Sequence, residues 1–119
     1  QPKAYAARKC FVSELLGTKR KLAWIQGIVV SYSDEELELD DGTGVVRVAS
    51  SKLTKDHFRR IKKGDYVNVT GAWRGRISKF QSHSIKALSN PNAEALWLCE
   101  ILDCHFYHKL GCHPLLKEQ

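Results

Sequence analysis

The sequence lacks an apolar run long enough to cross a bilayer, and residues 1–10 do not have the pattern of a secretory signal. A membrane-spanning helix needs about 20 predominantly apolar residues. The sequence also lacks a glycine-rich phosphate loop, paired carboxylates on converging elements and a nucleophile motif. We therefore expect a soluble, intracellular, non-catalytic protein with no cofactor and no membrane partner.

The placement of the cysteines argues against a disulfide framework. The four cysteines are Cys10, Cys99, Cys104 and Cys112. Two bridges would suit a small secreted protein, but three of these residues fall in one stretch near the end of the chain, which is a poor way to cross-link a fold. The 119 residues have enough apolar content for one core. We expect reduced thiols and a single domain over residues 1–119.

What the sequence does contain, between residues 22 and 88, is a series of strand patterns. Residues 22–32 are rich in β-branched and aromatic side chains, and Gly27 in their middle indicates a bend or bulge. Glu36–Asp40 alternates acid with leucine, as a half-buried strand does. Asp41-Gly42 then forms a turn dipeptide. Three further strands are predicted over residues 44–49, 66–72 and 80–88.

Helical spacing predicts three helices around these strands. A short N-terminal helix is expected over residues 4–16, and a second short helix within residues 50–63, capped by Ser51. After Asn90-Pro91, nothing breaks a helix to residue 108. The order matches a mainly β protein with flanking helices, namely a five-stranded OB barrel over residues 22–88 with a helix between its third and fourth strands. An SH3-like barrel is the alternative, but it lacks that helix.

The last helix, residues 91–108, is more apolar than docking on its own barrel requires. Its apolar side chains cover an arc of roughly 200°, whereas a helix on one surface needs a stripe of somewhat over 100°. The bland interpretation is that the barrel covers the whole arc. The alternative is that one flank meets a helix of another subunit, with Trp97 as the anchor. The partner-binding candidates are Trp97, Leu98, Ile101, Leu102 and His105.

The sequence resembles the RecQ-mediated genome instability protein 2 family in four stretches, namely residues 23–29, 39–44, 64–71 and 88–97. The resemblance implies an OB subunit that pairs, through its C-terminal helix, with an OB domain of RecQ-mediated genome instability protein 1. It implies a nuclear assembly with a RecQ helicase and topoisomerase III, which dissolves double Holliday junctions. It also implies that Lys86 and Trp97 help to hold the assembly together. Nothing is carried over to the basic connector, residues 18–21, or to residues 106–119, which include the tail of residues 109–119.

Single-stranded DNA is the rival ligand, which would make this an OB protein of replication, repair or telomere maintenance. The net charge of +6 favours phosphate, but the outward positions of the second predicted strand are Glu36, Glu38 and Asp40, and the second and third strands carry no aromatic platform. The aromatics lie on other strands, where we expect them in the core. The candidate DNA contacts, which could equally be a solvated surface, are Arg59, Arg60, Lys62, Lys63, Arg74 and Arg76. We expect weak or no direct DNA binding.

A zinc site is a third, weaker hypothesis. Cys104 and His108 are one helical turn apart, and Cys112 with His113 could fold back to complete four ligands. Structural zinc normally uses closely paired ligands from two elements, and this spacing does not follow that pattern. The plainer interpretation makes the cysteines small apolar residues and leaves the histidines in solvent, so no metal is predicted.

Overall fold

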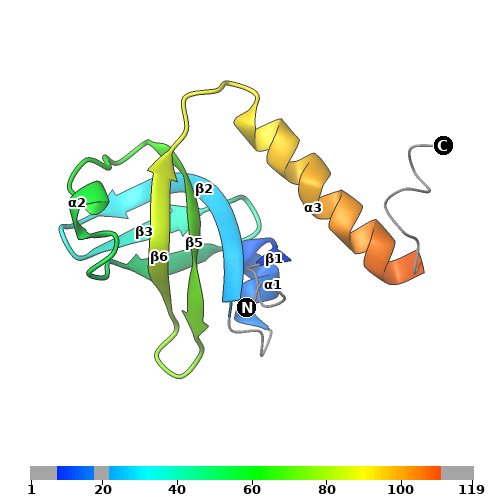
Figure 1. Cartoon of the computed structure of the whole chain (residues 1–119), viewed down its shortest axis with the longest axis horizontal. Helices are drawn as coiled ribbons and strands as arrows, with labels where there is room; N and C mark the ends of the chain where they lie inside the picture. The colour runs from blue at the N-terminus through cyan, green and yellow to red at the C-terminus, as the bar shows by residue number, and fades with distance from the viewer. Residues whose placement is uncertain (1–7, 18–21, 111–119) are drawn as a thin grey trace.

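The computed structural model describes residues 8–17 and 22–110, with only the backbone described for residues 104–110. Five strands close into a barrel (Figure 1). In chain order they are β2 (Leu22–Tyr32), β3 (Glu36–Asp40), β4 (Val45–Ala49), β5 (Tyr66–Arg74) and β6 (Lys79–Ala87). Around the barrel the order is β2, β3, β4, β6, β5, and antiparallel pairing of β2 with β5 completes the circle. The predicted OB fold is confirmed.

Two glycines allow strands to approach more closely than any side chain would permit. A Cβ at Gly27 would lie 2.6 Å from the carbonyl oxygen of Asp40, and one at Gly71 would lie 2.1 Å from that of Gln81. Of the predicted bend or bulge at Gly27, the bulge lies further along the strand, because the β2–β3 register shifts between Val29 and Ser31. Gly71 does adjoin a shift in the β5–β6 register. Both glycines admit a neighbouring backbone at a strongly curved part of the barrel.

The N-terminal helix is shorter than predicted. Its first expected residues lie outside the described part of the chain, and Arg8–Lys9 forms a short strand, β1, parallel to β2. The helix α1 spans only Val12–Leu16. Its start is fixed from the β3–β4 turn, because the Val12 N–H donates to Asp41 Oδ2 at 2.8 Å and the Ser13 N–H to Thr43 Oγ1 at 3.1 Å. Helical periodicity cannot reveal capping groups supplied from a distant turn.

The helix between the third and fourth barrel strands is a single turn, α2, spanning Lys55–Phe58. Ser51 does not cap it as predicted. The Ser51 Oγ instead accepts a hydrogen bond from the Leu53 N–H at 3.2 Å, which makes a turn before the helix. Thr54 precedes the helix and is joined to β6 by a 2.8 Å bond between its hydroxyl and that of Ser82. This contact holds α2 over the end of the barrel.

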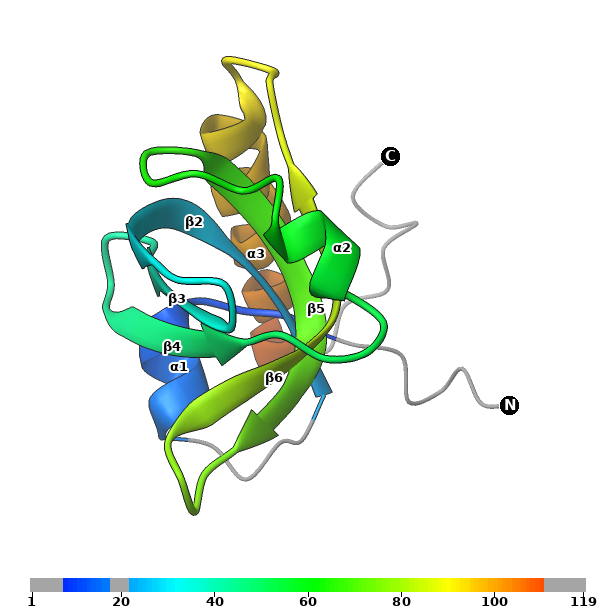
Figure 2. The same ribbon diagram turned by 90° about the vertical axis from the view of Figure 1, so that its left-hand side faces the viewer.

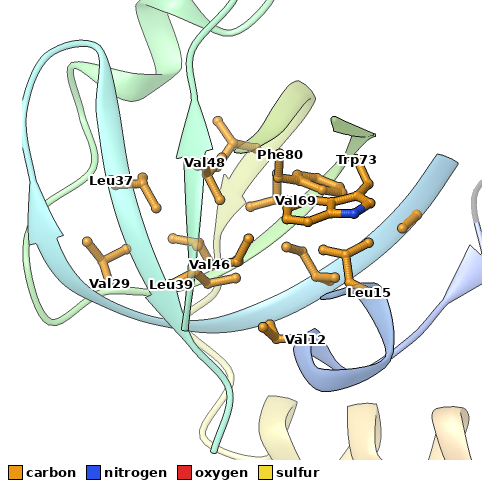
Figure 3. Packing of buried hydrophobic residues seen from close by; sticks show 14 of the residues in the cluster. Val12, Leu15, Val29, Leu37, Leu39, Val46, Val48, Val69, Trp73 and Phe80 are labelled. Atoms are coloured by element: carbon orange, nitrogen blue, oxygen red, sulfur yellow. The ribbon is translucent and has the colours of Figure 1, made fainter. Parts of the chain in front are cut away.

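The core lies inside the barrel and is closed at one end by α1 (Figure 3). The alternating leucines of β3 point inward, with Leu37 and Leu39 essentially buried. Phe80 and Trp73 lie in the core as expected. Trp24 does not, because it faces outward from β2 and is only half-buried. The outward position of Trp24 shows which barrel face receives the last helix.

That helix, α3, spans Ala93–Leu110 and lies against the outside of the barrel (Figures 1 and 2). Its nearest elements are β1 and β2. The connection from β6 is fixed at Asn90, whose Oδ1 accepts from the Asn92 N–H at 2.8 Å and whose carbonyl accepts from the Ala93 N–H at 3.0 Å. Neither α3 nor any other helix in the described ranges has the length and apolar character to span a membrane.

Candidate partner-binding site

Two tryptophans join α3 to the barrel. Trp97 of α3 packs edge to face on Trp24, with the ring centroids 6.0 Å apart and the planes inclined by 61°. The Lys9 ammonium lies 4.8 Å from the Trp24 ring centroid and 5.8 Å from that of Trp97, and it also pairs with Glu100 at 3.1 Å. Edge-to-face rings and a cation over their faces are both attractive. The short strand β1 thus places Lys9 as a clamp on the helix.

A chain of hydrogen bonds between β2, β5 and α3 supports the contact between the two tryptophans. Trp24 Nε1 donates to Asn68 Oδ1, and Asn68 Nδ2 donates to Gln26 Oε1 at 2.6 Å. Gln26 Nε2 in turn donates to the Tyr66 hydroxyl at 3.1 Å and to the Ala93 carbonyl at 3.3 Å. Gln26 is buried, and these bonds satisfy both ends of its amide. The network fixes the start of α3 on β2 and β5.

The hydroxyl of Tyr66 at the end of this chain has a shifted pKa. Burial is the main cause and raises the pKa of Tyr66 above its ordinary value of 10.0. The carboxylates of Glu94 and Asp41 add to the rise, and the bond from Gln26 opposes it. The neutral phenol is therefore the form that the folded protein holds at physiological pH.

The predicted partner-binding residues separate onto different sides of α3. Trp97 and Ile101 are buried against the barrel, so in the isolated chain they contact their own fold, and the role of Trp97 as an anchor for a partner stays a prediction. Leu98 and Leu102, one turn apart, are 40% and 59% exposed. They form a ridge beside the buried stripe. His105 lies on α3, but its side chain is outside the described part of the chain.

Lys86 and Trp97 line the same groove, which lies between the β6–α3 connection and the barrel. The groove has a volume of about 350 Å³ and also includes Gln26, Leu88 and Leu96. Trp97 Nε1 is buried there without a hydrogen-bond partner among the described residues. Lys86 itself is exposed on β6. The two residues singled out by resemblance therefore share one place in the fold, although one is a packing residue and the other faces solvent.

The candidate DNA contacts fall into two separate groups. The exposed residues of the first group follow α2 and are Arg59, Arg60, Lys62 and Lys63. Those of the second are Arg74, at the end of β5, and Arg76, on the turn between β5 and β6. Figures 1 and 2 show α2 and this turn at different ends of the barrel. Six cations split in this way do not form one continuous basic path. Non-specific contact with phosphates is the chemistry that either group offers.

The outward carboxylates of β3 are largely occupied within the fold. Glu36 pairs with Lys79 of β6, Glu38 accepts a 2.9 Å bond from the Ser31 hydroxyl, and Asp40 accepts one of 2.8 Å from the Gly42 N–H. Their outward direction agrees with the sequence prediction, since Leu37 and Leu39 alternate with them and point into the core. An acidic strand at this position disfavours phosphate on the usual OB binding face.

The weak zinc candidates cannot be placed. The side chains of Cys104 and His108 and the whole of Cys112 and His113 lie outside the described residues. Within the described part of the chain, no group of three or more histidine, cysteine and acidic residues is arranged to hold a metal ion. Cys99 is exposed on α3 and Cys10 is buried in the core. The zinc hypothesis stays as the sequence left it.

The sequence matches the family model of RecQ-mediated genome instability protein 2 over residues 3–105. The chain belongs to this family. The match covers the barrel, the tryptophan pair and most of α3, and it identifies an OB-fold protein of genome maintenance. Comparison with curated proteins gives no match.

Solved structures with the same fold come from proteins of distant sequence. The S. pombe Stn1–Ten1 complex has a TM-score of 0.65 at 21% identity, covering 80% of this chain and 76% of the other. Yeast Stn1 and Ten1 give 0.71 at 16% identity, covering 94% and 80%. A replication protein A heterotrimer bound to single-stranded DNA gives 0.59 at 19% identity, covering 76% and 75%. At these identities the likeness shows the OB fold.

Three functional residues could not be singled out from the sequence. Lys9 stood within a predicted helix, and Gln26 and Asn68 appeared only as polar positions in predicted strands. The alternation of β5 did indicate that Asn68 faces outward with Thr70, but no pattern shows that α3 covers it. Contacts between elements far apart in the sequence carry no local signal.

Proposed function

We propose that this chain is a non-catalytic scaffold subunit that pairs with the OB domain of RecQ-mediated genome instability protein 1 through α3. In this role it supports a nuclear complex of RecQ helicase and topoisomerase III. That complex would serve DNA repair, replication and homologous recombination by dissolving double Holliday junctions. Family membership supports this proposal, and α3 supplies the surface for it.

The observation that carries the proposal is the exposed ridge of Leu98 and Leu102. Trp97 and Ile101 already occupy the barrel-facing stripe, so the ridge is apolar surface that the described fold does not cover. Apolar ridges one helical turn apart pack well into the groove of a second helix. The Lys9 clamp and the Gln26 network hold α3 so that the ridge faces away from its own barrel.

The structural relatives support the same type of assembly. The Stn1–Ten1 structures and the replication protein A heterotrimer are, by their own descriptions, complexes of several chains. Their OB folds cover most of this chain at TM-scores of 0.59 to 0.71. We infer from these structures that a small OB barrel of this kind can pair with an OB domain of another subunit. The identity of the partner rests on the family.

Co-purification with the OB domain of RecQ-mediated genome instability protein 1 tests the proposal. Leu98→Asp combined with Leu102→Asp should abolish association, because two carboxylates would be buried in an apolar interface. Both leucines are exposed, so the barrel should keep its thermal stability. The matched control is Ile77→Asp, since Ile77 is 58% exposed on the β5–β6 turn. Association of the double variant at wild-type strength would refute the proposal.

A further inference from the structure

One edge of β6 is unpaired over half its length. Parallel pairing with β4 covers only Lys79–Gln81, as Arg47 to Ala49 match those three residues. Beyond Gln81, the strand pairings of β6 within residues 8–17 and 22–110 are all with β5. An edge of this kind presents backbone N–H and C=O groups to any chain that can pair with it.

The geometry of the β5–β6 ladder identifies the residues whose backbone faces this edge. The Leu88 N–H donates to the Tyr66 carbonyl at 2.8 Å, beside the register pairs of Asn68 with Lys86 and Thr70 with Ser84. In an antiparallel ladder, every second residue bonds to the same neighbour and the residues between point their backbone groups the other way. Ile85 and Ala87 therefore direct their N–H and C=O groups toward the open edge.

A groove lies along this edge, and it extends from the outer faces of β2 and β5, across β6, to residues 53–61 on both sides of α2. It has a volume of about 640 Å³. Its apolar lining includes Ile61, Ile85 and Leu53, and the Leu53 side chain is 70% exposed at the rim. Leu53 thus places an exposed aliphatic side chain beside the unpaired edge, where a strand added to that edge would cover it.

The charged residues of the groove are of one sign. Arg60, which follows α2, and Lys86 of β6 lie on its lining with His57 and His83, and no aspartate or glutamate lines it. The groove thus combines backbone donors, backbone acceptors, an apolar wall and positive charge. A nucleic acid strand would satisfy the cations but offers no regular series of N–H donors for the carbonyls of the edge. A peptide main chain offers both donors and acceptors at strand spacing.

We propose that an extended acidic segment of a partner protein adds as a further strand to the His83–Ala87 edge of β6. Its backbone pairs with Ile85 and Ala87, its apolar side chains contact Leu53 and Ile61, and its carboxylates face Arg60. This site lies on the barrel and α2, so it is separate from the ridge on α3. The inference goes beyond the proposed function and gives the chain a second docking surface.

The test uses a short fluorescent peptide in which valine alternates with glutamate, titrated against the full-length chain by anisotropy. The wild-type chain should bind it, and Leu53→Asp and Arg60→Glu should each weaken binding about tenfold, the loss expected for roughly 1.4 kcal/mol of contact free energy. Leu53 and Arg60 are both exposed, so folding is preserved. Ile77→Asp again serves as the control and should bind as wild type does.

Peptide N-methylation distinguishes strand addition from simple charge attraction. One peptide carries methyl groups on its valine backbone nitrogens, and a second carries them on its glutamate backbone nitrogens, so the two have equal charge. Only one of them should lose binding, because only every second N–H group of an added strand faces β6. Equal binding of both peptides would overturn the proposal, as would absence of binding by the unmethylated one. Binding of oligothymidylate at the groove instead, with loss in Arg60→Glu, would assign it to nucleic acid. These readouts do not involve α3, so they are independent of the proposed pairing.

Discussion

The indole of Trp24 on β2 and the indole of Trp97 on α3 meet edge to face, 6.0 Å between centroids. Neither residue belongs to the core inside the barrel, which extends from Cys10 to Ile85 in the sequence without including either one. The contact is a second, outer layer of packing. Its free energy holds α3 in place and adds little to the closure of the barrel.

Replacing Trp97 should therefore release the helix and leave the barrel folded. Trp97→Ala removes a buried indole, a change that costs about 3 to 5 kcal/mol at buried sites. We expect α3 amides to lose protection in hydrogen exchange while β2 and β5 amides keep theirs. Association with the partner should fall as well, because the Leu98 and Leu102 ridge would no longer be held in position.

Trp97→Phe is the matched comparison. It keeps an aromatic ring on Trp24 and removes the Nε1 donor that is buried without a described partner. Because an unsatisfied buried donor costs free energy, its removal should offset part of the lost packing. Protection of α3 in Trp97→Phe should stay near the wild-type level. Loss of protection in β2 or β5 with Trp97→Ala would contradict the two-layer description.

DNA binding by the isolated chain should be weak and should not depend on joint action of the two basic groups. Each group can neutralise only a few phosphates, and they lie at different ends of the barrel (Figure 1). We expect dissociation constants above about 10 µM for labelled oligonucleotides at physiological salt. Reversing Arg59, Arg60, Lys62 and Lys63 should flatten the salt dependence, and reversing Arg74 and Arg76 should have its own additive effect. If either charge reversal alone abolished tight DNA binding, both basic groups would have to contact the same bound DNA strand, and the prediction would be wrong.

Alkaline pH should destabilise the fold through two tyrosines. Burial is the main reason that the pKa values of Tyr66 and Tyr32 lie above 10.0, and Asp34 adds to the rise at Tyr32 while Arg59 opposes it. Because both pKa values are higher in the folded state, the folded chain binds more protons than the unfolded chain just above pH 10. The stabilisation is complete below pH 10 and is lost as pH rises through the folded values.

Urea denaturation between about pH 8 and pH 11 measures this loss as a falling free energy of unfolding. Tyr66→Phe should lower stability near neutral pH, because it removes an acceptor of Gln26. It should also make the alkaline decline shallower, because one of the two shifted groups is gone. A decline as steep as that of the wild type would show that Tyr66 does not contribute.

The barrel strands were predictable because each strand has its own local pattern. The acid and leucine alternation of Glu36–Asp40 specified both the bounds and the inward face of β3. The helix predicted over residues 4–16 proved shorter because its start depends on Asp41, in the turn between β3 and β4. A bend or bulge was assigned to Gly27 because the sequence shows a glycine there; the structure uses that glycine for the close approach of the Asp40 backbone.

The candidate site was only partly predictable for a related reason. The width of the apolar arc on the last helix indicated two contact surfaces, and the structure does place Trp97 and Leu98 on different sides of it. Which side meets the barrel depends on Trp24 and Lys9, whose positions follow from strand pairing and not from helical periodicity. The open edge of β6 depends on how far β4 extends alongside it, and that length is likewise a property of the assembled sheet.

The position of α3 on the barrel also imposes an order of events when the chain folds. Trp24 and Asn68 are 44 residues apart in sequence, and their bond forms only when β2 and β5 pair. Pairing between distant segments is slow compared with helix formation. A complete chain that folds from the unfolded state can therefore form α3 as a helix before any surface exists to hold it. A partner that selects the seated helix would bind finished barrels and pass over incomplete ones, so complex formation would itself act as a checkpoint on folding.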